Sequence, residues 1–481
     1  MPSDLLHELQ PLFTPRSVAV FGVSARSESA GNRFIMVFEA YGYAGKIYPV
    51  HPTITEIYGH KVYSNVKAIP GPVDMAIIAA PARNVPQIIS DCVDKGVPAA
   101  EIFSAGFREV DEEGRKLEQE IIKKAGGKIR MVGPNCFGVY SPRGGLTLLP
   151  GANYPRKSGN IGILAQSGGW VTDLIWGSDA FNVFFSKAVS YGNGIDLNEV
   201  SLMEYFTADP ETEIIGAYLE GIGDGRRFME VVRNLRGKKP VVIWKGGLSE
   251  TGKRAVSSHT GSLAGDRNVY NAFFKQSGAV QAHDFEELLD TVAIFNYIPE
   301  GSYRNLAIIG GGGGVGVSAG DISEVYNMNI PKSTPDIVEK ITAFLPAQGT
   351  GNRNPFDIGA PSAPASILRT MLEIVHDWSA VDALIVNRLF FYGMKELMEA
   401  DPSEQGKRLD TIVEFKRTRA RKPVIVVLEE LSTGVDRIGV EKARRQVRDE
   451  LLKAGIYVVP SMLRAIRALS NLSSYWEGVS R

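Results

Sequence analysis

Short apolar stretches, each followed by small residues and then by a helical stretch, recur along the chain. Clear examples are SVAVFGVS (17–24), NIGILAQSGG (160–169) and NLAIIGGGGGVGV (305–317). Strands of this kind that alternate with helices predict parallel sheets covered by helices on both faces. Glycines make up 51 of the 481 residues, and they cluster at these strand ends. The predicted fold class is therefore α/β.

The alternation divides the chain into three predicted doubly wound parallel-sheet domains. Connections rich in polar residues, glycine and proline lie at 142–159 and 297–305, and such stretches mark boundaries. We expect a Rossmann-like domain over 1–148, followed by two flavodoxin-like domains over 155–298 and 303–481.

Composition excludes several classes of function. The 53 basic and 54 acidic residues leave a net charge of -1, so no global field attracts nucleic acid or an anionic membrane. Cys92 and Cys136 are the only cysteines, which excludes a disulfide framework, and no metal-type histidine spacing occurs. The start MPSDLLHELQ lacks signal-peptide features, and no apolar run reaches the ~18 residues of a membrane span. We expect a cytoplasmic protein without a metal site.

The turn after the first strand is expected to bind a nucleotide-like ligand, because ligands of doubly wound sheets lie at carboxyl ends of strands. The alternative is an ordinary tight turn around Gly22. A dinucleotide site needs GxGxxG and an acidic residue after the second strand, whereas that strand ends in Pro49-Val50-His51. Arg26 and Lys46 near strand ends instead favour a phosphorylated nucleotide such as coenzyme A.

A second glycine turn joins the strand at 160–165 to the helical stretch WVTDLIW. Main-chain N–H groups in the first turn of a helix lack partners within the helix and can bind an oxyanion. The alternative is a helix simply capped by Ser167. Because the turn follows a strand's carboxyl end, we favour a phosphate site at Gln166, Ser167, Gly168 and Gly169.

His259 lies in AVSSHTGSLAG (255–265), a run of hydroxyl-bearing residues and glycines without apolar periodicity, so we expect a mobile loop. An accessible neutral imidazole can take and pass on a phosphoryl group. Glu220, which ends the strand EIIGAYLE, is the candidate that orients the ring. The alternative is an exposed glutamate in a surface ion pair, and both interpretations stay open.

The motifs along the chain, in order, are TPRSVAVFGVS, GYAGKIYPVHP, VDMAIIAAPA, FSAGF, GPNCFG, ILAQSGG, AYLEGIGDGRRF, SSHTGSLAG and NPFDIG. This order resembles that of the α subunit of NDP-forming acyl-CoA synthetases, the ADP-forming acetyl-CoA synthetases, which are similar to the α chain of succinyl-CoA synthetase. The resemblance covers about residues 10–360 closely and the remainder in domain type. SHTGSLAG is its most specific motif.

The resemblance implies a function. The reaction would convert acyl-CoA, phosphate and ADP reversibly into carboxylic acid, CoA and ATP through an acyl phosphate. His259 would be transiently phosphorylated, Glu220 would steady the phosphohistidine, and the turn 166–169 would hold the phosphate. Domain 303–481 would be a ligase-CoA domain. The first domain would bind coenzyme A, with contacts expected from Gly22, Ser24, Arg26, Lys46, Pro49, Val50, Ala80, Pro81, Ser104, Ala105, Asn135 and Cys136.

The predicted units contain no apparent ATP-grasp domain. We therefore expect a separate ATP-grasp β subunit that binds ADP or ATP with Mg²⁺, in a hetero-oligomer. The family's SQSG begins here with Ala165, and the glycine turn 311–316 replaces the usual Asn-Ala-Gly-Gly-Pro-Gly. The role of that turn, the acyl group and the choice of adenine or guanine nucleotide stay open.

Two other functions compete with this one. A catalytically silent CoA or acyl-CoA sensor of the same fold would keep CoA binding without turnover, and the presence of His259 and Glu220 disfavours it. A nicotinamide dehydrogenase is disfavoured because the second strand runs into His51 rather than an acidic residue.

Overall fold

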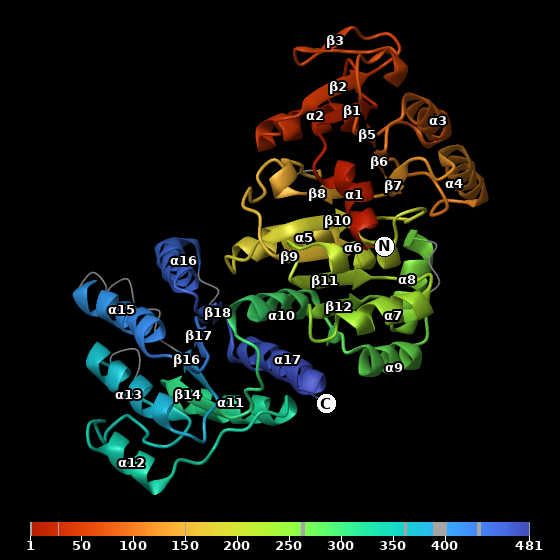
Figure 1. Cartoon of the computed structure of the whole chain (residues 1–481). Coiled ribbons are helices and arrows are strands. Elements are labelled where there is room, and N and C mark those ends of the chain that lie inside the picture. Colours follow the sequence, from red (N-terminus) through yellow and green to blue (C-terminus); the bar gives the residue numbers. More distant parts are fainter. Residues whose placement is uncertain are drawn as a thin grey trace. The chain divides into compact units, whose positions relative to one another are not determined.

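The computed structural model describes residues 2–26, 28–149, 151–260, 265–359, 363–387, 402–430 and 434–480. The chain forms two compact units, residues 1–179 with 183–288 and residues 180–182 with 289–481. Strands and helices alternate through both units (Figure 1). Within the described ranges, no helix has both the length and the apolar character that crossing a membrane requires.

The first sheet of unit 1 is entirely parallel. Its strand order is β2 (Lys46–Val50), β1 (Ser17–Phe21), β5 (Met75–Ile78), β6 (Ala99–Ile102) and β7 (Arg130–Val132). Side chains of β1 alternate between two cores, because Val18 and Val20 belong to one apolar cluster and Ala19 and Phe21 to the other. Both faces of the sheet are therefore buried, as in a doubly wound fold.

Helices supply the apolar side chains on each face of this sheet. One core includes Phe34 and Phe38 of α2, and the other includes Ile89 of α3 and Ile121 of α4. α4 begins where Asp111 accepts a hydrogen bond from the N–H of Gly114, a typical N-cap. The elements are α1 (Pro2–Phe13), α2 (Ala30–Tyr41), β3 (Glu56–Ile57), β4 (His60–Lys61), α3 (Val85–Lys95) and α4 (Glu112–Ala125).

The second sheet of unit 1 is parallel except for one edge strand. Its order is β13 (Val280–Ala282), β12 (Val241–Lys245), β11 (Ile214–Leu219), β9 (Ile161–Ala165), β10 (Phe185–Ser190) and β8 (Gly138–Tyr140). β8 pairs antiparallel with β10. β8 lies in the segment 1–148 of the sequence, so the chain adds a strand to the second sheet before the predicted boundary.

The helices that follow the strands of the second sheet are amphipathic or mostly buried. α7 buries Phe228, Val231, Val232 and Leu235, which lie on one face of a helix because their spacing is three to four residues. The helices are α5 (Gly168–Asp179), α6 (Glu199–Ala208), α7 (Gly225–Leu235), α8 (Glu250–Thr260), α9 (Arg267–Ser277) and α10 (Phe285–Tyr297), the last of which runs into unit 2.

Unit 2 contains a third sheet, which is again parallel. Its order is β15 (Phe356–Asp357), β14 (Leu306–Gly310), β16 (Ala383–Asn387), β17 (Val424–Val427) and β18 (Tyr457–Val459). The described helices are α11 (Gly313–Val325), α12 (Pro335–Thr342), α13 (Ala365–Asp377), α15 (Pro402–Thr418), α16 (Ile438–Lys453) and α17 (Met462–Ser480).

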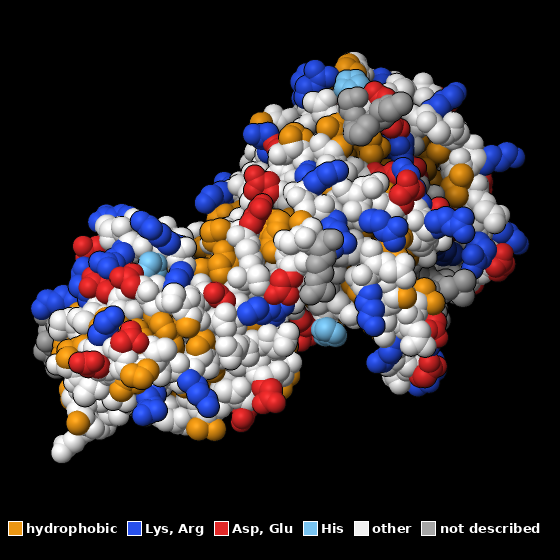
Figure 2. Space-filling view, turned by 60° about the horizontal axis from the view of Figure 1, so that its bottom comes forward, with side chains coloured by type: hydrophobic (Ala, Val, Ile, Leu, Met, Phe, Trp, Pro, Cys, Tyr) orange, Lys and Arg blue, Asp and Glu red, His pale blue; other side chains and the backbone are white. Residues whose placement is uncertain are grey.

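The predicted α/β fold class with parallel sheets is confirmed, and the antiparallel pairs among the described strands are β8 with β10 and the separate pair of β3 with β4. The three domain boundaries remain predictions. Figure 2 shows basic and acidic side chains intermixed on the face that it draws, which fits a net charge of -1.

Candidate functional site

Three neighbouring strands of the second sheet end in buried polar side chains. β9 runs into Gln166, β11 runs into Glu220, and β12 ends with Lys245. The exposed fractions of these residues are 6%, 6% and 4%, respectively. We call Gln166, Glu220 and Lys245 the carboxyl-edge cluster, because parallel strands place their carboxyl ends, and usually their ligands, at one edge.

Glu220 is held at three of its four polar atoms. Its main-chain N–H donates to Gln166 Oε1 at 3.0 Å, and its main-chain oxygen accepts from Lys245 Nζ at 2.7 Å. The Tyr218 hydroxyl donates to Glu220 Oε1 at 3.3 Å, and the Oε2 atom is buried without a hydrogen-bond partner in the described part of the chain. Glu220 is therefore buried, and the alternative interpretation, an exposed glutamate in a surface ion pair, does not hold among the described residues.

The Gln166 side chain holds the end of β11 by hydrogen bonds. Its Oε1 atom accepts from the main-chain N–H groups of both Glu220 and Gly221, at 3.0 and 3.1 Å. Its own N–H donates to Tyr218 O at 3.1 Å. The oxygen of this side chain thus joins two strand ends, whereas the sequence suggested only a role in holding phosphate.

Ser167, Gly168 and Gly169 form the turn that opens α5, as the glycine pattern predicts. A Cβ atom on Gly168 would lie 2.5 Å from the Phe137 ring, while one on Gly169 would meet, among the described residues, only Ser167 Oγ, at 4.0 Å. The start of the helix is also anchored by Trp170, whose ring lies 4.7 Å from that of Trp244. The first N–H groups of α5 consequently lie at the same edge as the cluster.

The described groups in direct contact with the Lys245 ammonium are neutral. Besides the bond to Glu220 O, its ammonium donates to Gly246 O and lies 4.4 Å from the centroid of the Tyr270 ring. Burial lowers the pKa of Lys245 to about 8, and the nearby Glu220 opposes that effect. The sequence analysis assigned no role to this lysine, although a charge at the end of the apolar strand VVIWK was a usable signal.

The prediction of a loop around His259 is wrong for its first part, since residues 255–260 continue α8. Ser249 starts the helix, because its Oγ accepts from Gly252 N–H at 3.0 Å. Val256 is buried and packs at Gly247. The His259 side chain and residues 261–264 lie outside the described residues.

The first sheet presents the predicted nucleotide turn at its own carboxyl edge. Gly22 has a φ of +85°, and a Cβ there would lie 2.1 Å from Ala79 O. A Cβ on Gly31 would lie 2.5 Å from the carbonyl carbon of Gly22. The two backbones therefore approach each other as closely as only glycine allows.

Asn32, which sequence reasoning missed, holds the turn together. It is 1% exposed, and its Oδ1 accepts from Ser24 N–H at 2.9 Å. Its Nδ2 donates to the carbonyls of Ser24 and Arg26, both at 2.8 Å. The signal was a lone amide in the apolar helix AGNRFIMVF. The turn is thus preformed, with the Arg26 side chain exposed.

Most of the other predicted CoA contacts follow the ends of strands in the same sheet. Ser104 donates to Ala80 O, and Asn135 N–H donates to Ser104 O at 2.9 Å. Cys136 is turned into the core, where its thiol donates to Ile102 O at 3.3 Å and burial raises its pKa well above the usual value. The strand ends at this edge carry Pro49, Val50, Ala80, Pro81, Ser104, Ala105, Asn135 and Cys136.

Lys46 lies at the opposite edge of this sheet. It begins β2 and pairs with Ser17, whereas Val50 at the carboxyl end pairs with Phe21. At about 3.3 Å per residue, four residues separate its backbone from the site edge by about 13 Å. The structure does not bring the Lys46 backbone together with Gly22.

A buried amide connects the two carboxyl edges of unit 1. Asn193 Nδ2 donates to Glu109 Oε2 and to Glu118 Oε1, both at 2.7 Å, and Arg108 donates to Asn193 O. Asn193 N–H donates to Pro134 O at 2.9 Å. Asn193 was missed because its partners come from distant parts of the sequence.

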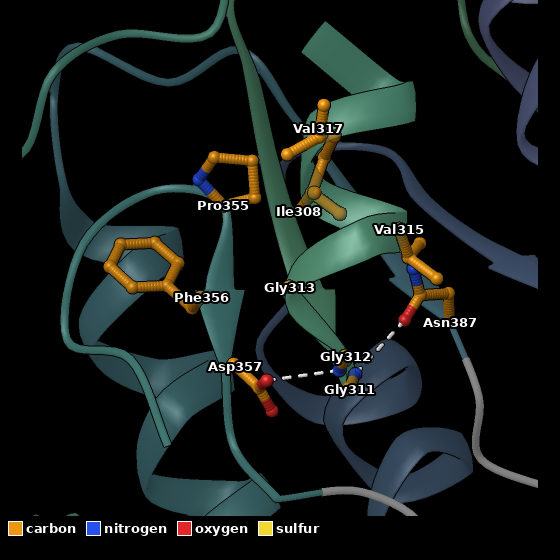
Figure 3. A pocket seen from close by; sticks show the side chains of 12 residues that line it. Ile308, Gly311, Gly312, Gly313, Val315, Val317, Pro355, Phe356, Asp357 and Asn387 are labelled. Carbon is orange, nitrogen blue, oxygen red and sulfur yellow. Dashed lines mark hydrogen bonds between the residues drawn. The ribbon is translucent and has the colours of Figure 1, made fainter. Parts of the chain in front are cut away.

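The glycine turn of unit 2 borders a cavity of about 360 Å³ at the carboxyl end of β14 (Figure 3). The N–H groups of Gly311 and Gly312 donate to Asn387 Oδ1 and Asp357 Oδ2, at 3.3 and 3.0 Å. Two polar side chains thus fix the turn, and Ile308, Val315, Pro355 and Phe356 make the cavity wall largely apolar.

Two known protein families match consecutive segments of the chain. Residues 16–142 match the family described as a CoA binding domain. Residues 158–295 match the succinyl-CoA ligase like flavodoxin domain.

Curated relatives and solved structures extend the similarity over the whole chain. The chain is 36% identical to acetate–CoA ligase [ADP-forming] I subunit alpha of Pyrococcus furiosus, over 96% of this chain and 97% of that one. It is 36% identical to acetate–CoA ligase [ADP-forming] I of Archaeoglobus fulgidus, over 83% of this chain but 57% of the relative. The dinucleotide forming acetyl-coenzyme A synthetase 1 of Ca. Korarchaeum cryptofilum, solved in complex with phosphate and ADP, superposes with a TM-score of 0.81 at 31% identity, covering 98% of this chain and 97% of that one.

Proposed function

Because the chain belongs to the ADP-forming acetate–CoA ligase family, we propose that it is the α subunit of an NDP-forming acyl-CoA synthetase with His259 as phosphoryl carrier. The reaction converts acyl-CoA, phosphate and a nucleoside diphosphate into a carboxylic acid, CoA and a nucleoside triphosphate. The observation that carries this proposal is Glu220, a buried carboxylate at a strand end whose Oε2 has no partner among the described residues.

The proposed reaction has three steps. A phosphate oxygen attacks the thioester carbon, the C–S bond breaks, and the thiolate takes up a proton to give CoA. A ring nitrogen of His259 then attacks the phosphorus of the acyl phosphate, and the carboxylate leaves. The terminal oxygen of the nucleoside diphosphate finally attacks phosphorus, the P–N bond breaks, and the imidazole is restored.

Glu220 supports the second step by orienting the imidazole. A carboxylate that accepts the N–H of one ring nitrogen fixes the tautomer, so the other nitrogen keeps its lone pair for attack. It also stabilises the positive charge that the ring acquires. The opening N–H groups of α5, at Ser167 to Gly169, would hold the phosphate oxygens at the same edge.

Coenzyme A would bind at the carboxyl edge of the first sheet. The preformed turn around Gly22 and Ser24, together with the exposed Arg26, supports this placement. The match of residues 16–142 to a CoA binding domain agrees with it. Asn193 then lies between the CoA edge and the phosphoryl-transfer edge.

The nucleotide site would come from a partner subunit. The P. furiosus relative is named a subunit alpha, and the A. fulgidus relative has substantial sequence beyond the part matched here. We propose an ATP-grasp β subunit that binds ADP or ATP with Mg²⁺, in a hetero-oligomer with this chain.

Labelling tests the function directly. The protein is mixed with acyl-CoA and ³²P-phosphate, or with its partner and γ-labelled ATP. We expect an acid-labile, alkali-stable label that His259→Ala abolishes. Label that survives this substitution would refute the phosphoryl-carrier role. Calorimetric CoA binding with no label under any condition would instead favour a CoA sensor.

A further inference from the structure

Lys245 is a buried cation at the carboxyl-edge cluster to which the proposed reaction assigns no role. It is 4% exposed and forms no ion pair with any carboxylate that the structure describes. Its described partners are the carbonyl oxygens of Glu220 and Gly246 and the face of the Tyr270 ring. Neutral partners compensate an ammonium less well than a carboxylate does.

Lys187 in the same sheet shows the contrast. It is also buried, but its Nζ lies 2.8 Å from both Asp209 Oδ2 and Glu211 Oε2, so its charge is neutralised within the fold. No carboxylate of the described residues forms such an ion pair with Lys245, and the Glu220 carboxylate acts on its charge only from farther away. A positive charge that is only partly compensated at this edge is suited to an anion that arrives there.

The same ammonium also fixes Glu220. The Glu220 peptide is held on its N–H side by Gln166 and on its carbonyl side by Lys245. With Oε1 bound by the Tyr218 hydroxyl, only Oε2 is left to meet an incoming group. Loss of Lys245 would therefore release one of the two main-chain anchors that direct this carboxylate.

We propose that Lys245 is a positioning residue for phosphoryl transfer, whose ammonium fixes the Glu220 main chain and balances the negative charge of the phosphoryl group held at the carboxyl-edge cluster. This inference rests on the proposed function. The described titratable groups that face the ammonium are Glu220 at the end of β11 and Tyr270 on α9. The charge of Glu199 on α6 helps to raise the pKa of Tyr270.

The test compares Lys245→Met with Lys239→Met by the rate of ³²P labelling from acyl-CoA and phosphate, with the partner subunit present. Lys239 is the matched control, because its Nζ also donates to two carbonyls, Phe206 O at 2.9 Å and Asp209 O at 2.7 Å, just before β12 begins. We expect Lys245→Met to label about 100-fold more slowly. Lys239→Met should label like the wild type, and both should bind CoA normally.

The pH profile separates positioning from a merely structural role. The wild-type labelling rate should fall above pH 8, as the ammonium loses its proton. Lys245→Arg, which keeps its charge, should lose this alkaline fall, and it provides a second readout if the Met variant does not fold.

Two results would overturn the inference. One is that the Lys245 variants label at the wild-type rate and keep the wild-type pH profile. The other is an equal slowing in Lys245→Met and Lys239→Met that follows their lost stability. If His259→Ala abolishes the label in either case, the proposed function stands and only the role of Lys245 fails. Label surviving His259→Ala would instead refute the function itself.

Discussion

Gln166 and Glu220, which are 54 residues apart, are joined by a hydrogen bond of 3.0 Å from the Glu220 main-chain N–H to the Gln166 side-chain oxygen. The bond ties the turn that opens α5 to the carboxylate that would orient a phosphorylated ring. In the proposed function, phosphate binding and ring orientation would therefore depend on one another through this buried amide.

Replacing this amide should impair both stability and labelling. Gln166→Ala leaves the buried N–H groups of Glu220 and Gly221 without their acceptor, which costs about 1–3 kcal/mol. We expect labelling of His259 to slow by about 10- to 100-fold, as for loss of other supporting hydrogen bonds. Denaturant unfolding and ³²P incorporation measure the two effects. Asn160→Ala, which removes an exposed bond to Glu213, is the control and should change neither.

The charge of Glu220 should matter more to labelling than to folding. Glu220→Gln keeps the shape of the side chain but removes the acceptor for the imidazolium, so labelling should fall about 100-fold or more. Unfolding free energy should be unchanged or higher, because a buried carboxylate oxygen without a described partner is removed. Glu213→Gln, just before the same strand, should behave as wild type. Equal labelling by both variants would contradict the assigned role.

The two glycines at the start of α5 should differ sharply. Gly168→Ala places a methyl group 2.5 Å from the Phe137 ring, so we expect a loss of about 1–3 kcal/mol in unfolding free energy. In the part of the chain that the structure describes, the new methyl group of Gly169→Ala meets only Ser167 Oγ, at 4.0 Å, so this change should be neutral or slightly stabilising. Thermal melting of the two variants checks the expected difference in stability. Equal melting temperatures would mean that the Phe137 ring moves aside without cost.

Glu101 should make the protein less stable as pH rises. Burial raises its pKa from 4.5 to about 8, partly offset by the hydrogen bond from Val139 N–H. The folded state therefore holds a proton that the unfolded state has released, and stability falls across pH 4.5 to 8 by up to about 1.4 kcal/mol per unit. Denaturant unfolding of Glu101→Gln over that range should show a flatter profile. Parallel profiles would mean that Glu101 is ionised in the folded protein.

The local sequence pattern was sufficient to predict the strands and the family resemblance. Apolar runs such as SVAVF and IGILA are strands buried on both faces, as expected of parallel strands in a sheet that helices cover on both sides. The resemblance to acyl-CoA synthetase α subunits, carried by motifs quoted in order, is confirmed by the relative that is 36% identical. The reaction through His259 and the individual site residues remain predictions.

Local pattern was misleading where long-range contacts or capping decide the structure. Residues 255–260 are helical because Ser249 caps α8 and Val256 packs at Gly247. β8 turns antiparallel at the edge of the second sheet through its pairing with β10. Neither effect is visible in apolar periodicity, since each depends on one or two specific contacts.

The sequence by itself determined the α/β class, the strands and the strand end on which Glu220 lies, because continuous apolar runs that alternate with helical stretches are visible in the order of residues along the chain. Only the tertiary structure decided that Glu220 is buried, that Gln166 and Lys245 hold its main chain, and that Lys46 starts β2 at the far edge. The physical reason is that strand order and register bring together groups from separate segments, and hydrogen bonds between such groups leave no periodic trace in the sequence.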